Sequence, residues 1–133
     1  MSVVIIIFPA CGGDLMSPYG ILRSTNYPKP YPKDLRCAWT IVAPRGHKIS
    51  LIFQDFALEN NVRCSDGDFV AVYDGKSLAS KKVGEYCGST IPPTFTSSTD
   101  KLHITFRTNR IAELRGFIAS YNSSMGKEGL AWD

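Results

Sequence analysis

Apolar and polar residues alternate with a period of two along most of this chain, whereas the spacing typical of an amphipathic helix is nearly absent. Alternation of this kind places every second side chain on the same face of a β-strand. It predicts strands at residues 39–42, 49–53, 69–73, 102–106 and 117–121. In the second of these, Ile49, Leu51 and Phe53 would share one buried face. The pattern therefore predicts an all-β domain.

Turn-forming residues separate the predicted strands. They are the proline-rich residues 27–32, Pro44-Arg45-Gly46, Asp66-Gly67, Asp74-Gly75 and Ile91-Pro92-Pro93. Short strands bounded by Gly and Pro are typical of antiparallel sandwiches and barrels. A weak helical pattern at residues 77–82 is interpreted as a loop. The small and polar residues 122–133 are interpreted as a linker or tail.

The chain has four cysteines, at positions 11, 37, 64 and 87, and none of them forms a Cys-x-x-Cys pair. An even number of widely spaced cysteines indicates two disulfides, which are typical of proteins outside the reducing cytosol. Three pairings are possible. The pairing of nearest neighbours, Cys11 with Cys37 and Cys64 with Cys87, closes loops of about 25 residues and is favoured by loop length alone.

Residues 1–10 contain the apolar run Val3-Val4-Ile5-Ile6-Ile7-Phe8, which is too short to cross a bilayer. Three interpretations remain open for this leader or N-terminal extension. It is the apolar part of a truncated signal peptide, a strand that pairs with a sheet, or sequence added to the natural chain. No other segment resembles a transmembrane span, so no membrane span is expected in this chain.

Charge and motifs exclude several function classes. The 133 residues carry a net charge of +3, with 15 Lys and Arg spread along the chain. Without a basic stripe or a recognised motif, nucleic-acid binding is not expected. No hydrolase, metalloprotease or phosphate-loop motif occurs, and His47 and His103 are expected at the surface, so no catalytic residue is predicted. Asn122-Ser123-Ser124 is a candidate N-glycosylation site.

The residues around the cysteines resemble a known extracellular family. In order, these are Cys-Gly-Gly at 11–13, Tyr-Pro at 31–32, Cys37-Ala38-Trp39, the run from Asp68 to Gly75, Tyr86-Cys87-Gly88 and Gly116-Phe117. Their order is similar to that of the CUB domain, a module of complement proteases, tolloid proteinases, neuropilins and cubilin. The resemblance covers residues 11–121, nearly the whole predicted core.

Several expectations about the fold follow from the resemblance alone. It implies a two-sheet antiparallel β-sandwich of jelly-roll type. It implies disulfides between Cys11 and Cys37 and between Cys64 and Cys87, in agreement with the pairing favoured by loop length. It also implies that the large apolar residues Trp39, Phe53, Phe106 and Phe117 belong to the core.

The resemblance further implies a calcium site, because many CUB domains hold calcium at one end of the sandwich. Glu59, five residues before Cys64, and Asp68 match the family's acidic ligands, and Tyr31 matches a supporting tyrosine. Asn109 stands where the calcium-binding members have Asp. The loss of one negative charge predicts weak binding, in the sub-millimolar to millimolar range of extracellular modules.

Two residues near this site leave alternatives open. Asp66 would compensate for the missing carboxylate if its side chain pointed inward. If no ion binds, Glu59 and Asp68 would be loop carboxylates, hydrogen-bonded to the backbone or paired with Arg110.

The sequence therefore predicts a secreted or extracellular, non-catalytic recognition module. In this interpretation the acidic end binds a Lys or Arg side chain of a protein partner, with or without calcium. One alternative is a calcium-independent binder of glycans or heparin-like polyanions, as in spermadhesins, through basic residues such as Lys29, Lys33, Arg36, Arg45 and Lys48. Another is a targeting or dimerisation module of a larger secreted protease.

Overall fold

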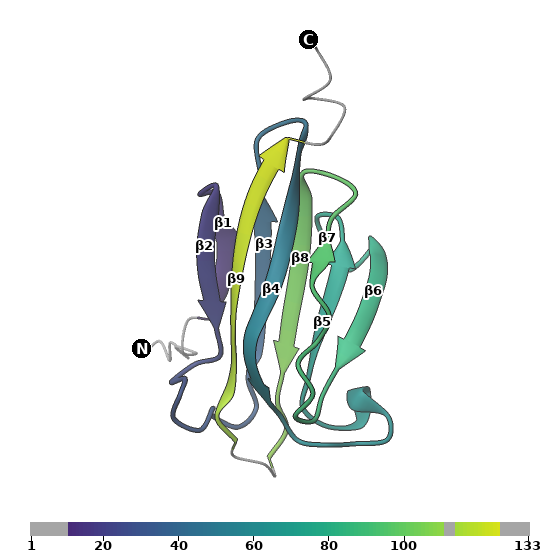
Figure 1. Ribbon diagram of the computed structural model, residues 1–133. Helices are drawn as coiled ribbons and strands as arrows, with labels where there is room; N and C mark the ends of the chain where they lie inside the picture. The colour runs from purple at the N-terminus through teal and green to yellow at the C-terminus, as the bar shows by residue number, and fades with distance from the viewer. Residues whose placement is uncertain (1–10, 111–113, 126–133) are drawn as a thin grey trace, which may run out of the picture.

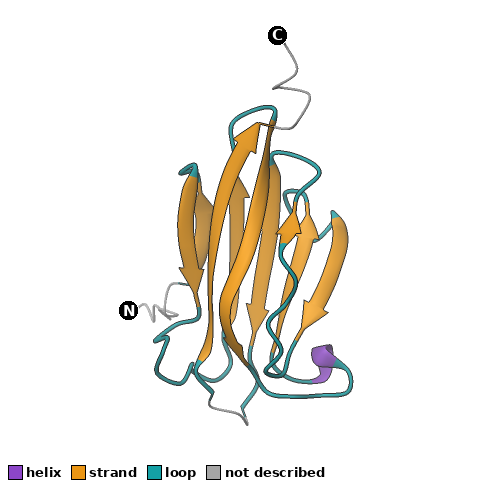
Figure 2. Ribbon diagram, in the orientation of Figure 1, coloured by secondary structure: helices purple, strands orange, loops and turns teal. Residues whose placement is uncertain are grey.

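The computed structural model describes residues 11–110 and 114–125, which form two β-sheets packed face to face (Figure 1). The five-stranded sheet has the order β1-β3-β8-β5-β6, and the four-stranded sheet has the order β2-β9-β4-β7. The strands are β1 (Gly12–Leu15), β2 (Tyr19–Arg23), β3 (Arg36–Val42), β4 (His47–Ala57), β5 (Phe69–Asp74), β6 (Lys81–Tyr86), β7 (Phe95–Thr96), β8 (Lys101–Arg107) and β9 (Gly116–Met125). Within the described residues the only helix is a short 3-10 turn, η1 (Cys64–Asp66) (Figure 2). The predicted β-sandwich is confirmed.

The five strands predicted from the alternating pattern all lie within observed strands, namely β3, β4, β5, β8 and β9. Strand β9 is longer than expected, because it pairs with β4 as far as Met125, which lies opposite His47. Residues 122–125 of the predicted tail therefore belong to the sheet. At the predicted loop, residues 77–80 are irregular, but Lys81 and Lys82 already begin β6.

One strand pair departs from the antiparallel expectation. Strands β1 and β3 run parallel, with Gly12 beside Ala38. The chain leaves β1, crosses to the other sheet as β2, and returns to the first sheet as β3, so the two strands point the same way. A Cβ atom on Gly12 would lie 2.0 Å from the carbonyl oxygen of Ala38, so only glycine permits this close approach.

The core lies between the sheets, where the inward-facing residues of both sheets meet. Trp39, Phe53, Phe106 and Phe117, which the resemblance assigned to the core, are each at most 7% exposed. Phe117 contacts the edges of its neighbours, with ring centroids 5.1 Å from Phe106 and 6.0 Å from Trp39. Edge-to-face packing of this kind stabilises a core beyond the burial of area alone.

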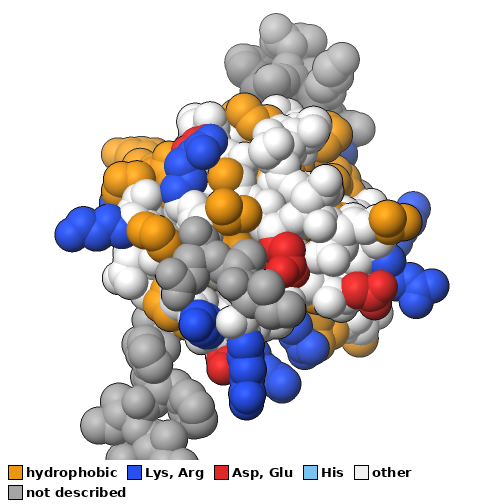
Figure 3. Space-filling model, turned by 90° about the horizontal axis from the view of Figure 1, so that it is seen from below, with side chains coloured by type: hydrophobic (Ala, Val, Ile, Leu, Met, Phe, Trp, Pro, Cys, Tyr) orange, Lys and Arg blue, Asp and Glu red, His pale blue; other side chains and the backbone are white. Residues whose placement is uncertain are grey.

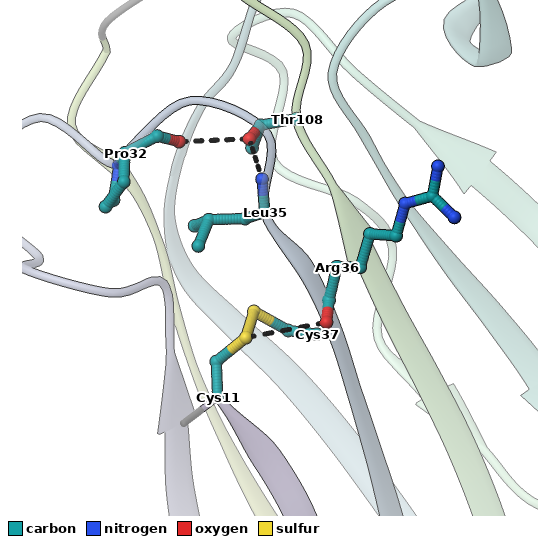
Figure 4. Close-up of a disulfide and its surroundings, with 6 residues drawn as sticks. All are labelled: Cys11, Pro32, Leu35, Arg36, Cys37 and Thr108. Carbon is teal, nitrogen blue, oxygen red and sulfur yellow. Dashed lines mark hydrogen bonds between the residues drawn. A yellow bond between two sulfur atoms is a disulfide. The ribbon is translucent and has the colours of Figure 1, made fainter. Parts of the chain in front are cut away.

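Both expected disulfides are present, Cys11–Cys37 and Cys64–Cys87, so all four cysteines are paired. The first joins the residue before β1 to β3, and the second joins η1 to the residue after β6. Close to the first disulfide, Thr108 ties two segments together (Figure 4). Its hydroxyl accepts a hydrogen bond from Leu35 N and donates one to the carbonyl of Pro32. This contact fixes the segment that carries Tyr31 against the end of β8.

No helix in the described part of the chain is long and apolar enough to cross a membrane. Residues 1–10, for which three interpretations were open, lie outside the described residues.

Candidate functional site

The candidate ligands gather at one end of the sandwich, the lower end in Figure 1. Glu59 follows β4, Asp68 stands immediately before β5, and Asn109 follows β8. Because β5 and β8 are antiparallel neighbours, the start of one meets the end of the other, with Phe69 beside Arg107. Figure 3 shows this end, where acidic side chains lie among uncharged ones and Lys and Arg side chains project mainly around the edge.

Asp68 is the buried centre of the cluster, with none of its surface exposed. Its Oδ2 accepts a hydrogen bond of 2.6 Å from the Tyr31 hydroxyl, and its Oδ1 accepts one of 2.6 Å from the backbone N–H of Asn109. Burial and the hydrogen bond to Asp68 raise the pKa of Tyr31 well above its usual value, so the phenol stays a donor. Tyr31 thus supports Asp68 through this hydrogen bond, and both residues are hidden from solvent.

Glu59 is half-buried, and its two carboxylate oxygens differ in their surroundings. Oε1 accepts three hydrogen bonds: from Asn61 Nδ2 at 2.9 Å, from Asn109 Nδ2 at 3.0 Å and from the backbone N–H of Asp68 at 3.1 Å. Oε2 accepts none from the residues that the structure describes. One oxygen therefore fixes the side chain, and the other is left for water or a ligand.

Sequence reasoning missed two members of this cluster, Asn61 and Gly67. A Cβ atom on Gly67 would lie 1.9 Å from Glu59 Oε1 and 2.0 Å from Asn61 Nδ2, so a glycine leaves the space in which these groups meet. In the sequence, Asn61 is marked only by its place two residues after Glu59, and Gly67 only by its place in a turn with Asp66. Neither feature predicts this contact.

Two alternatives were left open near this site, one for Asp66 and one for Arg110. Asp66 lies in η1 with an exposed side chain, and no hydrogen bond links its carboxylate to the rest of the cluster among the described residues. Arg110 forms a solvent-exposed ion pair with Asp34 at 3.6 Å, and among the described residues it does not pair with Glu59 or Asp68, which was one of the alternatives. The expected hydrogen bonds from backbone N–H groups to Glu59 and Asp68 are present.

The cluster fits calcium in the kind of donor but not in charge. In the described ranges no group of three or more His, Cys, Asp or Glu side chains converges as a metal site. Two carboxylates and the amide oxygen of Asn109 are hard oxygen donors, which calcium prefers, but the ion favours a higher count of negative ligands. Asn109 also directs Nδ2, not its oxygen, at Glu59. The amide would have to rotate by half a turn before it could bind a cation.

The two histidines are partly exposed, so they lie at the surface but are less exposed than the sequence predicted. Nδ1 of His103 lies 2.9 Å from the Thr40 hydroxyl across the β3–β8 pair, and burial lowers the pKa of His103. His47 begins β4 at the opposite end from Glu59, and its buried Nδ1 has no hydrogen-bond partner among the described residues. Their cross-strand neighbours explain the burial, which the sequence pattern alone does not show.

A second polar cluster, which sequence analysis did not predict, supports the same end of the sandwich. Arg115 donates two hydrogen bonds of 2.7 Å to the carboxylate of Asp55, and the Tyr27 hydroxyl donates one of 2.6 Å. These bonds hold the pKa of Asp55 well below its usual range. The backbone N–H of Tyr31 bonds the carbonyl of Leu114, next to Arg115. The cluster therefore anchors the segment that delivers Tyr31 to Asp68.

Comparison with known proteins places this geometry in a family. The family model described as "CUB domain" matches residues 11–121. Cubilin of Rattus norvegicus is 38% identical over 117 residues, which are 88% of this chain and 3% of cubilin. CUB and zona pellucida-like domain-containing protein 1 of Homo sapiens is 42% identical over 118 residues, 89% of this chain and 19% of that protein. The chain thus spans only a small part of the relatives it matches.

A solved structure shows the same fold over most of the chain. The crystal structure of the MASP-1 CUB2 domain bound to Ca2+ superposes with a TM-score of 0.76 at 29% identity, covering 85% of this chain and 99% of that one. Two sheets, two disulfides and the matched residues 11–121 agree with the expectation from the resemblance. The chain belongs to the CUB domain family.

Proposed function

We propose that this domain is an extracellular recognition module whose acidic end binds a Lys or Arg side chain of a protein partner. CUB domains are non-catalytic interaction modules, and the two disulfides fit an extracellular environment. The observation that carries the proposal is the asymmetry of Glu59. Three donors hold Oε1 in place, and Oε2 receives no hydrogen bond from the described residues. A carboxylate held in this way offers a basic group a charge-assisted hydrogen bond with little loss of side-chain freedom.

Exposure decides which acidic groups meet the partner. Asp68 has no exposed surface, so a side chain of the partner cannot contact it. Glu59 is half-buried and Asp66 is exposed on the neighbouring turn η1. The basic side chain would therefore lie against Glu59 and Asp66, and Asp68 and Tyr31 would hold the loops beneath them.

Calcium is proposed as a weak ligand of the same end. Glu59, Asp68 and Asn109 would hold the ion, and its charge would orient the carboxylates. Asn109 already orients both carboxylates, because its Nδ2 donates a hydrogen bond to Glu59 and its backbone N–H donates one to Asp68. The ion must displace one of these hydrogen bonds, and the site has one negative charge fewer than a site with Asp at position 109. We therefore expect a calcium affinity in the millimolar to sub-millimolar range.

The proposal is tested with a small basic probe and amide chemical shifts. The probe is N-acetyl-lysine amide, and the control is N-acetyl-norleucine amide, which has the same chain length without the ammonium group. We expect the lysine compound alone to shift the resonances of residues 59–68, with a larger effect in calcium than in EDTA. Equal shifts with the norleucine compound, or shifts confined to other parts of the domain, would contradict the proposal.

A second candidate function, the binding of a polyanion, is favoured by one feature of the register. Arg36 on β3 lies directly opposite Arg107 on β8, and both side chains are exposed. Like charges in this position repel each other, and a sulfate or carboxylate group between them would relieve the repulsion. Arg45 and Lys48 lie at the other end of β3 and β4, so the predicted basic residues do not form one patch.

Retention on heparin separates the two candidates. If a polyanion binds, Arg107→Ser should elute at clearly lower salt than the parent, and Arg45→Ser, which also loses one charge, should elute less early. Equal elution of both variants would indicate that only net charge matters, which would remove the Arg36–Arg107 pair as a site.

A further inference from the structure

On the outer face of the four-stranded sheet, the neighbouring strands β2 and β9 carry a single charged side chain, Arg23 of β2. Strand β9 itself contains no charged residue. On the adjacent edge strand β2, Tyr19 is 74% exposed and Ile21 is 63% exposed. A solvated sheet face normally carries polar and charged side chains, so neighbouring exposed apolar side chains indicate a covering group.

Asn122 lies beside these apolar residues on β9. It is exposed, and its side-chain amide makes no hydrogen bond to the described residues. Asn122 stands directly opposite Tyr19 of β2 on one side and Ser50 of β4 on the other. Side chains opposite each other on adjacent strands have Cβ atoms about 5 Å apart, and diagonal neighbours such as Ile21 lie about 7–8 Å away.

Asn122-Ser123-Ser124 is the only Asn-x-Ser/Thr sequence in the chain. We propose that Asn122 carries an N-linked glycan whose first sugars lie over Tyr19 and Ile21. The apolar face of a sugar ring packs against an aromatic ring, and a ring attached to Nδ2 of Asn122 reaches the Tyr19 side chain one strand away. The glycan thereby covers this face of the sheet.

The modification is a transfer from a lipid diphosphate-linked oligosaccharide, the donor of the secretory pathway. A bond forms between Nδ2 of Asn122 and the anomeric carbon of the first sugar, and the bond from that carbon to the diphosphate oxygen breaks. The diphosphate leaves with the bonding electrons, and the amide nitrogen gives up one proton. Because the Asn122 side chain points away from the core, the attached glycan leaves the pairing of β9 with β2 and β4 intact.

The glycan and the proposed recognition site occupy different parts of the molecule. Asn122 lies near the end of β9, beside the start of β4, whereas Glu59 and Asn109 lie at the other end of the sandwich (Figure 1). A glycan at Asn122 therefore leaves the acidic end accessible. It also blocks a partner from approaching over the outer face of the four-stranded sheet.

Glycan attachment is tested by secretion of the full chain from mammalian cells, followed by intact mass and peptide mapping. We expect a glycan at Asn122 that is absent in Ser124→Ala and retained in Ser123→Ala, which preserves the acceptor sequence. A secreted parent protein without a glycan overturns the proposal.

Contact with Tyr19 is tested by a double-mutant cycle. We expect the glycosylated parent to unfold a few degrees above the Ser124→Ala variant, and we expect Tyr19→Ser to abolish this difference. Leu78→Ser, which alters another exposed apolar residue far along the chain, should leave the difference unchanged. If Tyr19→Ser retains the full difference, the glycan does not lie on this ring, and the proposed cover of the sheet is wrong.

Discussion

The side-chain amide of Asn109 donates a hydrogen bond of 3.0 Å to Oε1 of Glu59, between loops that follow two different strands. Its backbone N–H bonds Asp68 at the same time. One neutral residue therefore joins the two carboxylates that a cation would otherwise hold together. An aspartate at this position would face Glu59 with oxygen in place of N–H.

Asn109→Asp should make the domain dependent on calcium. In EDTA we expect a loss of about 1–3 kcal/mol in the free energy of unfolding, because a donor to Glu59 becomes a repelling carboxylate. In calcium the variant should recover this loss and bind the ion more tightly than the parent. Calorimetric titration and thermal unfolding, each with and without calcium, measure both effects. Asn26→Asp, the same change at an exposed position outside this cluster, serves as the control; equal behaviour of the two variants would contradict the prediction.

Tyr31→Phe should destabilise the domain without changing the packing of its ring. The variant keeps the edge-on contact with Phe106 but removes the only side-chain donor to Oδ2 of buried Asp68 that the structure shows. A buried carboxylate oxygen without its donor costs about 1–3 kcal/mol. Urea unfolding measures the loss. Tyr19→Phe, at a position 74% exposed, should be neutral, and a neutral Tyr31→Phe would show that water replaces the phenol at no cost.

Gly67→Ala should disorder the acidic end while the sandwich stays folded. The new methyl group would occupy the place of Glu59 Oε1 and Asn61 Nδ2, so one or both side chains must leave. Amide hydrogen exchange should become faster in residues 59–68 and stay unchanged in β8 and β9. Ser65→Ala, an exposed change in the same turn, is the control. Unaltered exchange at Asp68 N, which donates to Glu59, would argue against the described geometry.

Acid should weaken the domain partly through Asp55. Hydrogen bonds from Arg115 and Tyr27 lower the pKa of this carboxyl in the folded state, so it adds stability above its unfolded value of about 3.9. That stability is lost as the pH falls through the lower folded pKa, because the folded state must then take up the proton. The gap in urea midpoint between parent and Asp55→Asn should therefore be largest near pH 6 and shrink toward pH 2. A gap that does not change with pH would exclude this origin.

The sequence pattern predicted the inner strands well because their alternation is imposed by the core. Leu102, Ile104 and Phe106 of β8 are fully buried, and polar residues separate them. Strands β1 and β7 are too short or too exposed to carry this signal, with no fully buried residue in either. The parallel pairing of β1 could not be predicted from alternation either, because it depends on the route of the chain through β2.

Family spacing located Glu59, Asp68, Tyr31 and Asn109, which the structure brings together by direct hydrogen bonds. It did not show that the Asn109 amide replaces a charge, since this depends on the direction of a side chain. The Arg115–Asp55 pair joins residues 60 positions apart in the sequence and has no local signature. Contacts of this kind become visible only when the fold brings the loops together.

The burial of Asp68 has a consequence for any attempt to map a partner by mutagenesis. Both of its oxygens are engaged inside the domain, and no part of its surface is exposed. If the proposed binding occurs, replacement of Asp68 would abolish it by letting three loops separate, and an alanine scan would rank Asp68 with the contact residues. A binding surface inferred from such a scan would wrongly include the buried residue Asp68. Only a comparison with folding measurements on each variant would separate the contact residues of the proposed interface, such as Glu59, from residues that support the fold, such as Asp68.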